Sequence, residues 1–368
     1  MQGIVRRHRE QDKAAGHESR VLTVFETAPA GGPDIGLGAG WWWTPGGVRR
    51  AFRRHGVPAV NGALAVYHNG WSLPLLAPGD GAQRRIAYLH TEWPGLAVAV
   101  RASARWCDGI ICVSEALVAA VHRTVPDYPK ERVHRIHYPV APPADVRINA
   151  VAAADGQRPF RVGYVGRLDA TQKRVERLPE LMRAWPAGGR AVEWHVLGDG
   201  PERRRLERLA AAAGSARFHG WLNGNEYWQA LAALDAVVFF SDYEGTPIAL
   251  LEAMSVGVTP LFPKIGGDGE SLARGISTEC VYPAGDLAAA ARQLQALAGR
   301  GQDERAARAR QAVAAHTPEN YAADFARVVE ATWSGPRYSA NETVRTGRWS
   351  DLLPMALVRR YHEKAIWS

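Results

Sequence analysis

The chain has 368 residues, of which 46% are apolar and 22% are charged, and this composition is typical of folded globular proteins. At roughly 100–200 residues per domain, the length predicts two domains. The 45 Lys and Arg residues exceed the 37 Asp and Glu residues, so the net charge is +8, which favours anionic ligands or an anionic surface. Three scattered cysteines are too few for a disulfide framework or a zinc site, and they fit a reducing cytoplasm.

The N-terminal residues 1–20 are polar and basic and contain no apolar signal core, so we expect a mobile extension there and no secretion. No run in the chain approaches the roughly 18 apolar residues of a transmembrane helix. We therefore expect a cytoplasmic protein, and any membrane contact would be made from its surface.

Residues 21–142 alternate short apolar runs with helical patterns and predict a first α/β domain. Its expected strands are residues 21–25, 63–67, 86–89, 109–113 and 133–136. The glycine-rich residues 31–40, followed by three tryptophans, predict a long loop without regular structure. Residues 44–47 (Thr-Pro-Gly-Gly) predict a turn into a helix over 48–55.

The second half of the chain has a clearer pattern. Residues 143–158 are rich in Ala and Pro and are expected to be the linker. The strands expected after it are residues 160–165, 192–197, 216–218, 236–240, 258–262 and 280–282. A helix over 201–213 is expected to end at Gly214. This alternation predicts parallel sheets, so the fold class is α/β, with two Rossmann-like, doubly wound domains that face a cleft. In such sheets ligands bind beyond the carboxyl ends of the strands.

The stretch after the expected strand 236–240 reads Ser-Asp-Tyr-Glu-Gly-Thr-Pro-Ile-Ala-Leu-Leu-Glu-Ala-Met. Thr246 as N-cap and Pro247 as the first helical residue would start a helix whose N-terminus favours an anion. Glu244 precedes this start, and Glu252 follows roughly 7.5 Å along the axis. Because Glu252 lies among apolar residues, it needs a donor, and sugar hydroxyls are suitable. A capped surface helix with one solvated glutamate is the alternative.

The loop after the expected strand 160–165 carries Arg167 and Lys173. A forked guanidinium and an ammonium group together suit a diphosphate, although surface arginines and lysines are more often only solvated. Residues 198–202 (Gly-Asp-Gly-Pro-Glu) predict a tight turn into a helix, for which we favour a structural role. Residues 218–221 (Phe-His-Gly-Trp) follow another short strand, where main chain or aromatic rings could contact a nucleobase.

Taken in order, these four motifs resemble the donor-binding domain of family 4 glycosyltransferases, which are retaining enzymes with the GT-B fold. The resemblance is close over residues 160–290, moderate over 86–140 and weak before 85. It implies an acceptor-binding domain over 21–142 and a nucleotide-sugar donor-binding domain over 159–335. Apolar spacing over residues 348–366 predicts a helix, and the resemblance implies that the C-terminal segment 336–368 packs back on the first domain, rather than on the second domain alone.

The resemblance also implies roles for particular residues. Arg167 and Lys173 match the pair that binds the donor diphosphate and stabilises the leaving phosphate. Glu252 matches the glutamate that holds the ribose, and Glu244 matches the glutamate beside the transferred sugar. The remaining donor-binding residues are His219 and the loop Gly245, Thr246, Pro247 and Ile248, of which the main-chain N–H groups are expected at the sugar and phosphate.

In the first domain, His90 matches the acceptor-domain histidine that faces the donor sugar, and we expect it to bind a sugar hydroxyl rather than to transfer a proton. A lone histidine at a strand end is otherwise a structural group. Gly46 and Gly47 match the double-glycine loop near the phosphates, a role for which Gly31 and Gly32 compete.

The resemblance implies a reaction that moves a sugar from a UDP- or GDP-sugar to a hydroxyl of a glycan, a lipid-linked acceptor or another cell-envelope or exopolysaccharide acceptor. No Asp-x-Asp metal-ligand motif stands at a suitable strand end. Arg167, Lys173 and a helix N-terminus can instead stabilise the departing diphosphate, so we expect no metal and no cofactor. No covalent nucleophile stands out, and we expect retention, with the acceptor attacking the face that the diphosphate leaves.

Three tryptophans at 41–43 lie near Arg49, Arg50, Arg53 and Arg54. Such a cluster could contact an anionic membrane at its inner face, stack on sugars, or fill a small core.

Other functions remain as alternatives. An oxidoreductase is not expected, because residues 36–41 miss the Gly-x-Gly-x-x-Gly pattern by position. A nucleic-acid binder is not expected either, because the cations are spread along the chain. A GT-B sugar-nucleotide epimerase or hydrolase, or an inactive nucleotide-sugar-binding scaffold, would share the fold.

Overall fold

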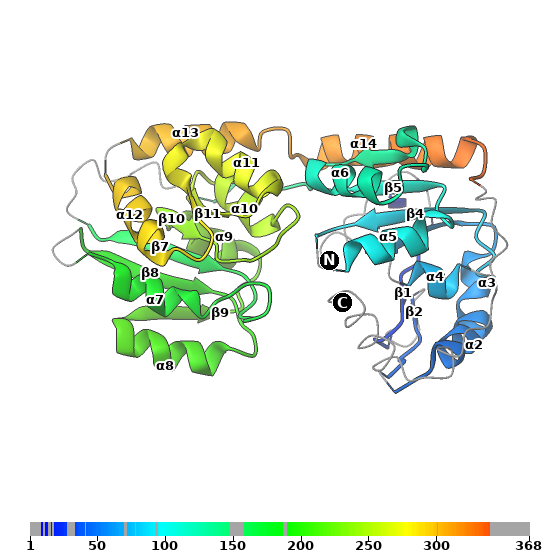
Figure 1. The fold of residues 1–368 in the computed structure, drawn as a ribbon, viewed down its shortest axis with the longest axis horizontal. Coiled ribbons are helices and arrows are strands. Elements are labelled where there is room, and N and C mark those ends of the chain that lie inside the picture. Colours follow the sequence, from blue (N-terminus) through cyan, green and yellow to red (C-terminus); the bar gives the residue numbers. More distant parts are fainter. Residues whose placement is uncertain are drawn as a thin grey trace. The chain divides into compact units, whose positions relative to one another are not determined.

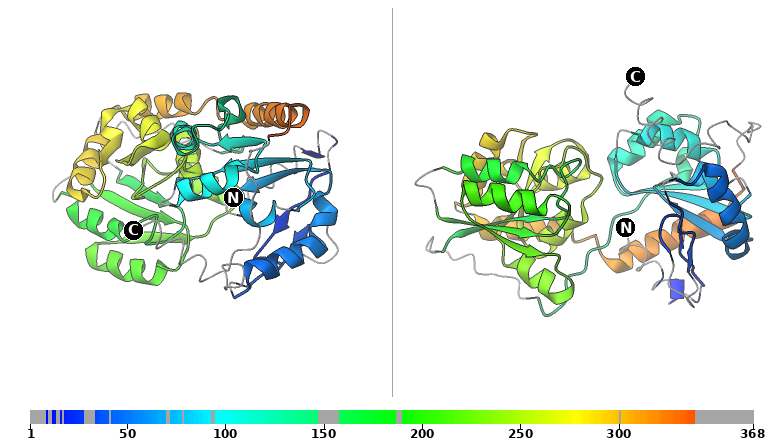
Figure 2. Two further views of the ribbon diagram at one scale, coloured as in Figure 1. Left: turned by 45° about the vertical axis from the view of Figure 1, so that its right-hand side comes forward. Right: turned by 90° about the horizontal axis from the view of Figure 1, so that it is seen from below.

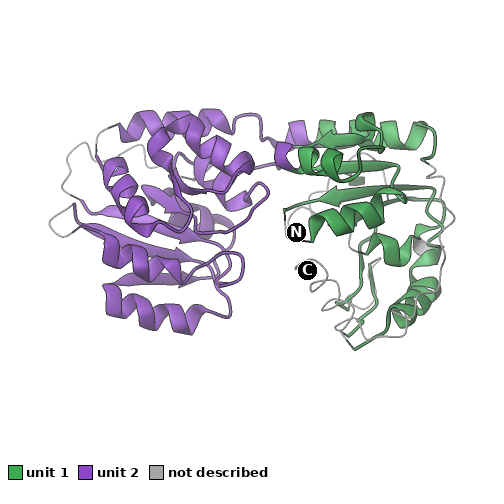
Figure 3. Ribbon diagram, in the orientation of Figure 1, with its two compact units in different colours: residues 1–112, 117–136, 322–368 green, residues 113–116, 137–321 purple. Residues whose placement is uncertain are grey.

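Figure 1 presents the computed structural model of the chain. It describes residues 9, 12–13, 16, 18–27, 34–40, 42–69, 72–77, 79–92, 95–146, 158–186, 190–299 and 301–338. The chain forms two compact α/β units. Unit 1 consists of Met1–Cys112, Leu117–Ile136 and Ala322–Ser368, and unit 2 consists of Val113–Ala116 and His137–Tyr321 (Figure 3). Among the described residues, no helix is both long and apolar enough to cross a membrane.

Unit 2 is built on a six-stranded sheet with the order β12-β11-β10-β7-β8-β9, and every described pair of neighbours is parallel. Its strands are β7 (Phe160–Val165), β8 (Val192–Leu197), β9 (Ala216–Gly220), β10 (Ala236–Val238), β11 (Thr259–Lys264) and β12 (Val281–Pro283). The chain runs from β7 outward to β9 and then resumes on the other side of β7 with β10. The strand order therefore reverses between β7 and β10, which is where open α/β sheets bind ligands.

Helices cover both faces of this sheet (Figure 2). They are α7 (Arg177–Ala184), α8 (Arg203–Ala213), α9 (Gly224–Ala232), α10 (Ile248–Ser255), α11 (Gly267–Ile276), α12 (Leu287–Leu297) and α13 (Gln302–Ala312), with a 3-10 turn at Thr278–Cys280. The apolar stripe of α8 buries Leu206 and Ala210, and Gly214 ends the helix as expected. Its first residue is Arg203, two positions after the expected start.

Unit 1 contains a four-stranded parallel sheet with the order β3-β4-β5-β6. Its strands are β3 (Leu64–His68), β4 (Arg84–Leu89), β5 (Gly109–Cys112) and β6 (Val133–Arg135). Its helices are α2 (Pro45–His55), α3 (Val57–Val60), α4 (Leu73–Leu76), α5 (Leu96–Ala104), α6 (Glu115–Thr124) and a 3-10 turn at Lys130–Arg132. Strands β4 and β5 are buried almost throughout, which explains their continuous apolar runs.

Two expectations for the start of unit 1 were wrong. The glycine-rich residues 31–40 contain strand β2 (Ile35–Gly36), which pairs in parallel with β1 (Leu22–Thr23) through main-chain hydrogen bonds that leave no side-chain signal. Helix α2 starts at Pro45 rather than at Val48, because the Thr44 hydroxyl accepts the Gly47 N–H as an N-cap and proline suits the first helical position.

The last described helix, α14 (Pro318–Ser334), carries the chain back into unit 1. The Arg84 guanidinium donates to the main-chain oxygens of Thr332 and Gly335, and the Tyr338 N–H donates to the Asp108 carboxylate. The return thus lies within α14, earlier than the segment 336–368 in which we expected it. Residues 339–368 lie outside the described part of the chain, as do Gly31, Gly32, Trp41 and residues 147–157 of the expected linker.

Candidate functional site

The two loops that leave the sheet of unit 2 at its switch point meet through an ion pair. Lys173, on the loop after β7, places its Nζ 2.5 Å from Oε1 of Glu244, on the loop after β10. The Glu244 side chain is only 7% exposed and that of Lys173 is 23% exposed. The structure therefore brings together two residues that the sequence placed in separate motifs, 71 positions apart.

Glu244 has further donors around it. The Ser241 hydroxyl donates to its Oε1 at 2.6 Å, and the Gln172 amide approaches its Oε2 at 3.4 Å. A buried carboxylate is stable only when it is paired and hydrogen-bonded, and this one is both. Ser241 and Gln172 were not among the expected site residues. Ser241 is nevertheless the first residue of the stretch that contains Glu244, and Gln172 directly precedes Lys173.

Further contacts link the same two loops. The Gln172 amide also donates to the main-chain oxygen of Tyr243, and the Asp242 N–H donates to the main-chain oxygen of Gln172. Asp242 in turn accepts from Arg174 at 2.5 Å and pairs with Arg177 at 2.8 Å. The relative position of the two loops is thus fixed by side chains as well as by the sheet.

Arg167, the second expected diphosphate ligand, is 60% exposed on the β7 loop and pairs with Asp169 at 2.6 Å. Burial would raise the pKa of Asp169, but main-chain hydrogen bonds from Gln172 and Thr171 and the charge of Arg167 lower it overall. The Tyr164 hydroxyl donates to the main-chain oxygen of Arg167 at 2.8 Å and holds the start of the loop. The Arg167 guanidinium is therefore exposed to solvent, whereas the main chain at Arg167 is held by the Tyr164 hydroxyl.

Helix α10 begins at Ile248, and the expectation that Thr246 caps it was wrong. The N-cap residue is Pro247, which cannot provide a side-chain cap, and the Thr246 hydroxyl donates instead to the main-chain oxygen of Val113, another residue of unit 2. Gly245, Thr246 and Pro247 are buried, whereas Ile248 is half-buried. The first turn of α10 thus has neither a side-chain cap nor an acidic residue, so its N–H groups and the positive end of the helix dipole are available to an anion.

Glu252 lies on α10 and receives a hydrogen bond that the sequence did not indicate. The Tyr227 hydroxyl, on α9, donates to its Oε2 at 2.5 Å. Burial and the adjacent carboxylate both raise the pKa of Tyr227, so this hydroxyl stays protonated and remains a donor. The expected need of Glu252 for a donor is met, within the protein, by a tyrosine on the preceding helix.

The Gly-Asp-Gly-Pro-Glu turn packs directly on the β7 loop. A Cβ on Gly198 would stand 1.9 Å from the main-chain oxygen of Gly166, and one on Gly200 would stand 2.4 Å from that of Leu168. Both glycines also have positive φ, +149° and +159°. This close contact of two main chains supports the structural role that we favoured for the motif.

His219 lies on β9, where a register shift follows the pair Val196–Phe218, so that Leu197 faces Gly220. This irregularity brings the His219 ring against His195 of β8, with Nε2 3.0 Å from Nδ1 of His195. Burial lowers the pKa of both imidazoles. Two residues further on, Trp221 is 65% exposed, and its indole N–H donates to Asn223.

His90 of unit 1 follows β4 directly and pairs with a second histidine that the sequence analysis missed. Its Nε2 lies 2.6 Å from Nδ1 of His68, the last residue of the neighbouring strand β3, and its ring stacks on Tyr88. Asn69, with φ of +60°, accepts the His90 N–H with its side-chain oxygen. Burial lowers the pKa of His68 to about 4, which keeps that partner neutral.

The structure thus joins Lys173 to Glu244 across the two loops, with Arg167 on the same loop as Lys173 and α10 starting four residues after Glu244. Gly46 and Gly47 lie in the first turn of α2 in unit 1, not in an open loop. The donor-binding and catalytic roles of all these residues stay predictions.

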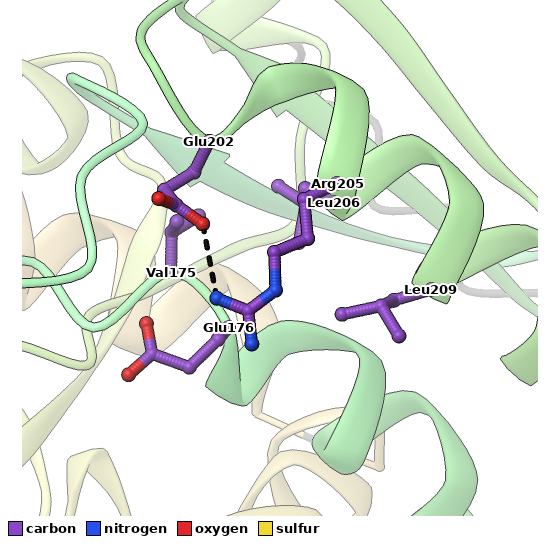
Figure 4. Close-up of a pocket in the computed structure, with 6 residues that line it drawn as sticks. All are labelled: Val175, Glu176, Glu202, Arg205, Leu206 and Leu209. Carbon is purple, nitrogen blue, oxygen red and sulfur yellow. Dashed lines mark hydrogen bonds and ion pairs between the residues drawn. The ribbon is translucent and has the colours of Figure 1, made fainter.

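A shallow surface hollow lies between the segment that leads into α7 and helix α8, and it encloses no space for a small molecule. Figure 4 shows the residues around it: Val175, Glu176, Glu202, Arg205, Leu206 and Leu209. Within the described ranges, no three His, Cys, Asp and Glu side chains are grouped so that they could hold a metal ion.

Two α/β units, each built on a parallel sheet with helices packed on it, have the architecture of the GT-B fold class. Comparison with solved structures agrees. The Anabaena protein HepE bound to UDP-glucose gives a TM-score of 0.60 at 17% identity, over 77% of this chain and 81% of that one. The lipopolysaccharide outer core galactosyltransferase WaaB gives 0.54 at 15% identity, over 70% and 71%.

Sequence comparison is more specific. Residues 159–300 match the family described as Glycosyl transferases group 1. The chain is 32% identical over 160 residues to the 2-deoxystreptamine N-acetyl-D-glucosaminyltransferase of Streptomyces fradiae, which is 42% of this chain and 37% of that protein. It is 30% identical over 182 residues to a GDP-mannose-dependent alpha-mannosyltransferase of Mycolicibacterium smegmatis, 47% and 46% of the two chains.

The matches to these curated relatives thus cover less than half of their length. The match of residues 159–300 to this family confirms the resemblance to family 4 glycosyltransferases that the motifs indicated.

Proposed function

We propose that the protein is a glycosyltransferase that transfers a sugar from a nucleoside diphosphate sugar to an acceptor hydroxyl with retention of configuration. The observation that carries the proposal is the Lys173–Glu244 pair at the switch point of unit 2, on loops one of which leads, four residues after Glu244, into the uncapped start of α10. The relative named as a GDP-mannose-dependent mannosyltransferase, and the neighbour bound to UDP-glucose, support a nucleoside diphosphate sugar as donor.

In this proposal the chain's own charges replace a divalent ion. Cleavage of the sugar–phosphate bond leaves negative charge on the diphosphate and positive charge on the anomeric carbon. Lys173, Arg167 and the N–H groups at the start of α10 would stabilise the diphosphate, since they are held in place before the reaction. Glu244, freed in part from Lys173 when the phosphates bind, would lie beside the sugar, and Glu252, oriented by Tyr227, would accept from the ribose hydroxyls.

The acceptor would be a glycan or a lipid-linked hydroxyl, with the protein in the cytoplasm or at the inner face of the membrane. His90 would bind a sugar hydroxyl, since His68, Tyr88 and Asn69 fix the position of its ring and main chain. Its pairing with a neutral His68 supports a hydrogen-bonding role rather than proton transfer.

A donor screen tests the proposal. Purified protein is incubated with GDP-mannose, UDP-glucose, UDP-N-acetylglucosamine and an ADP-sugar, with and without glycan or lipid-linked acceptors, and the released nucleotide is measured. We expect acceptor-dependent release that survives EDTA, and a product with retained anomeric configuration by NMR. Release without an acceptor would indicate an epimerase or hydrolase, and binding without turnover would indicate an inactive scaffold. Loss with EDTA or inversion would refute the proposed mechanism.

A further inference from the structure

The outer face of helix α2 consists of arginine side chains. Pro45, Val48 and Phe52 are buried against unit 1. At about 100° per residue, Arg50, Arg53 and Arg54 fall within an arc of roughly 100° on the opposite side of the helix. All three are exposed. We call these three arginines and Trp42, which precedes the helix, the α2 face.

The sequence around this face is basic. Residues 35–79 contain four arginines and no Asp or Glu. Among the described residues, none of the three exposed arginines of the α2 face has an ion-pair partner within 4 Å. On α8, by contrast, Arg203 pairs with Glu207 at 2.9 Å and Arg205 pairs with Glu202 at 3.3 Å.

Trp42 adds an exposed aromatic ring to the charges. It is 75% exposed, more than any other large apolar side chain in the described ranges. A Cβ on Gly40 would stand 2.4 Å from atoms of its ring, so the indole lies against a bare main chain. The Trp43 N–H donates to the Gly40 oxygen at 2.9 Å and closes the turn. The exposed position of the ring is therefore built into the turn that precedes α2.

We propose that the α2 face docks unit 1 onto a membrane surface that contains anionic lipids. The helix would lie in the plane of the surface, with its arginines at the lipid phosphates and Trp42 at the headgroup level, where indole rings are favoured. Because the apolar residues of α2 are used by the core of unit 1, the helix does not insert, and the attachment is electrostatic and reversible. This goes beyond the proposed reaction, and none of these residues belongs to the proposed donor site.

Charge and size favour a lipid surface over a nucleic acid. Helix α2 is 11 residues long, or roughly 16 Å, and presents three arginines, which is a small contact for a nucleic-acid backbone. A flat anionic surface matches one helix face with an indole at its end. Each basic residue near such a surface contributes roughly fivefold to the affinity, so the three arginines together contribute about a hundredfold. Raising the salt concentration should weaken binding steeply, since the Debye length falls from about 10 Å at 0.1 M to about 3 Å at 1 M.

Vesicle flotation with the full chain tests this inference. The vesicles contain phosphatidylcholine alone or with about one third phosphatidylglycerol, at low and high salt. The test variant is R50Q/R53Q/R54Q, and the matched control R204Q/R205Q/R208Q removes the same charge from the exposed side of α8. We expect binding only to the anionic vesicles at low salt, a loss of about a hundredfold in the α2 variant, at most a threefold loss in the control, and an intermediate loss for Trp42→Ala.

Further measurements make each outcome decisive. Thermal melting of the α2 variant should match that of the unmodified chain, since the three side chains are exposed. Equal losses in both triple variants would mean that only net charge matters, and would overturn the inference. No binding to anionic vesicles, with α2-dependent binding of a single-stranded RNA instead, would assign the face to nucleic acid.

Nucleotide release measured without vesicles should not change in the α2 variant. A rise in donor KM by the same factor would place the face in the donor site, and a chain that binds vesicles but transfers no sugar would refute only the proposed reaction.

Discussion

Replacement of Lys173 by methionine should separate the stability of unit 2 from its catalysis. The change leaves the 7%-exposed Glu244 carboxylate with only the Ser241 hydroxyl and the Gln172 amide as donors. Breaking a fully buried pair costs about 3–5 kcal/mol, and because Lys173 is partly exposed we expect a loss of about 2 kcal/mol in the free energy of unfolding. For a unit of this size that corresponds to a fall of roughly 4–8 °C in Tm.

The loss of kcat should be larger than the loss of stability, and the second substitution E244Q should not restore it. Removing one preorganised group that stabilises developing charge typically lowers kcat by about 10²–10³. In the double variant K173M/E244Q the unpaired buried charge is gone, so most of the lost stability should return while kcat stays low. Arg174→Ala is the matched control, since Arg174 joins the same two loops through its ion pair with Asp242 but is 39% exposed. This substitution should lower the free energy of unfolding by less than about 1 kcal/mol.

Urea unfolding and steady-state nucleotide release on the same preparations provide the measurements. The reasoning is refuted if kcat of K173M falls only by the fraction of protein that is unfolded, or if E244Q restores both stability and kcat.

Three further predictions concern other contacts. Tyr227→Phe removes the donor to Glu252 and should raise the donor KM about five- to tenfold with kcat within threefold; an equal fall in kcat would contradict a ribose-binding role for Glu252. The folded-state pKa of His68, about 4, lies below the ordinary 6.5, so the unfolded chain takes up the proton first. Stability should therefore be lost as the pH falls from about 6.5 to 4, by at most roughly 3 kcal/mol, and urea titrations of His68→Phe should lack this loss. Asp80→Asn should destabilise unit 1 by about 3–5 kcal/mol, because the buried Arg85 loses its paired carboxylate; a loss below 1 kcal/mol by urea unfolding would be incompatible with that burial.

The core of unit 2 was predictable because its strands carry the signal themselves. Strands β7 and β8 lie at the expected residues 160–165 and 192–197, since buried parallel strands read as short apolar runs between turns. The loops that follow them were predictable for the same reason, because the carboxyl end of a strand fixes where the next loop begins.

Contacts between distant segments were not predictable. The capping preference of Thr246 is a local rule, and it failed because the hydroxyl binds the Val113 main chain, 133 positions away. The Tyr227 donor to Glu252 and the His68 partner of His90 lie 25 and 22 positions from their acceptor or partner. The position of His68 could have indicated this pairing, because His68 ends β3, which lies next to the strand that His90 follows.

The shift that turns His219 toward His195 left no sequence signal, because such irregularities depend on pairing with the neighbouring strand. Strand β2 was missed for a related reason: two residues joined by main-chain hydrogen bonds need no particular side chains.

The path of the chain through its two units has a consequence for synthesis in the cell. Unit 1 is interrupted after Ile136 and resumes only at Ala322, in the helix whose end supplies carbonyl oxygens to Arg84. At about 5–20 residues per second, a ribosome needs roughly 10–40 s to make the intervening segment. During that interval the nascent first unit lacks its last helix, so it cannot complete its fold until the second unit has been synthesised.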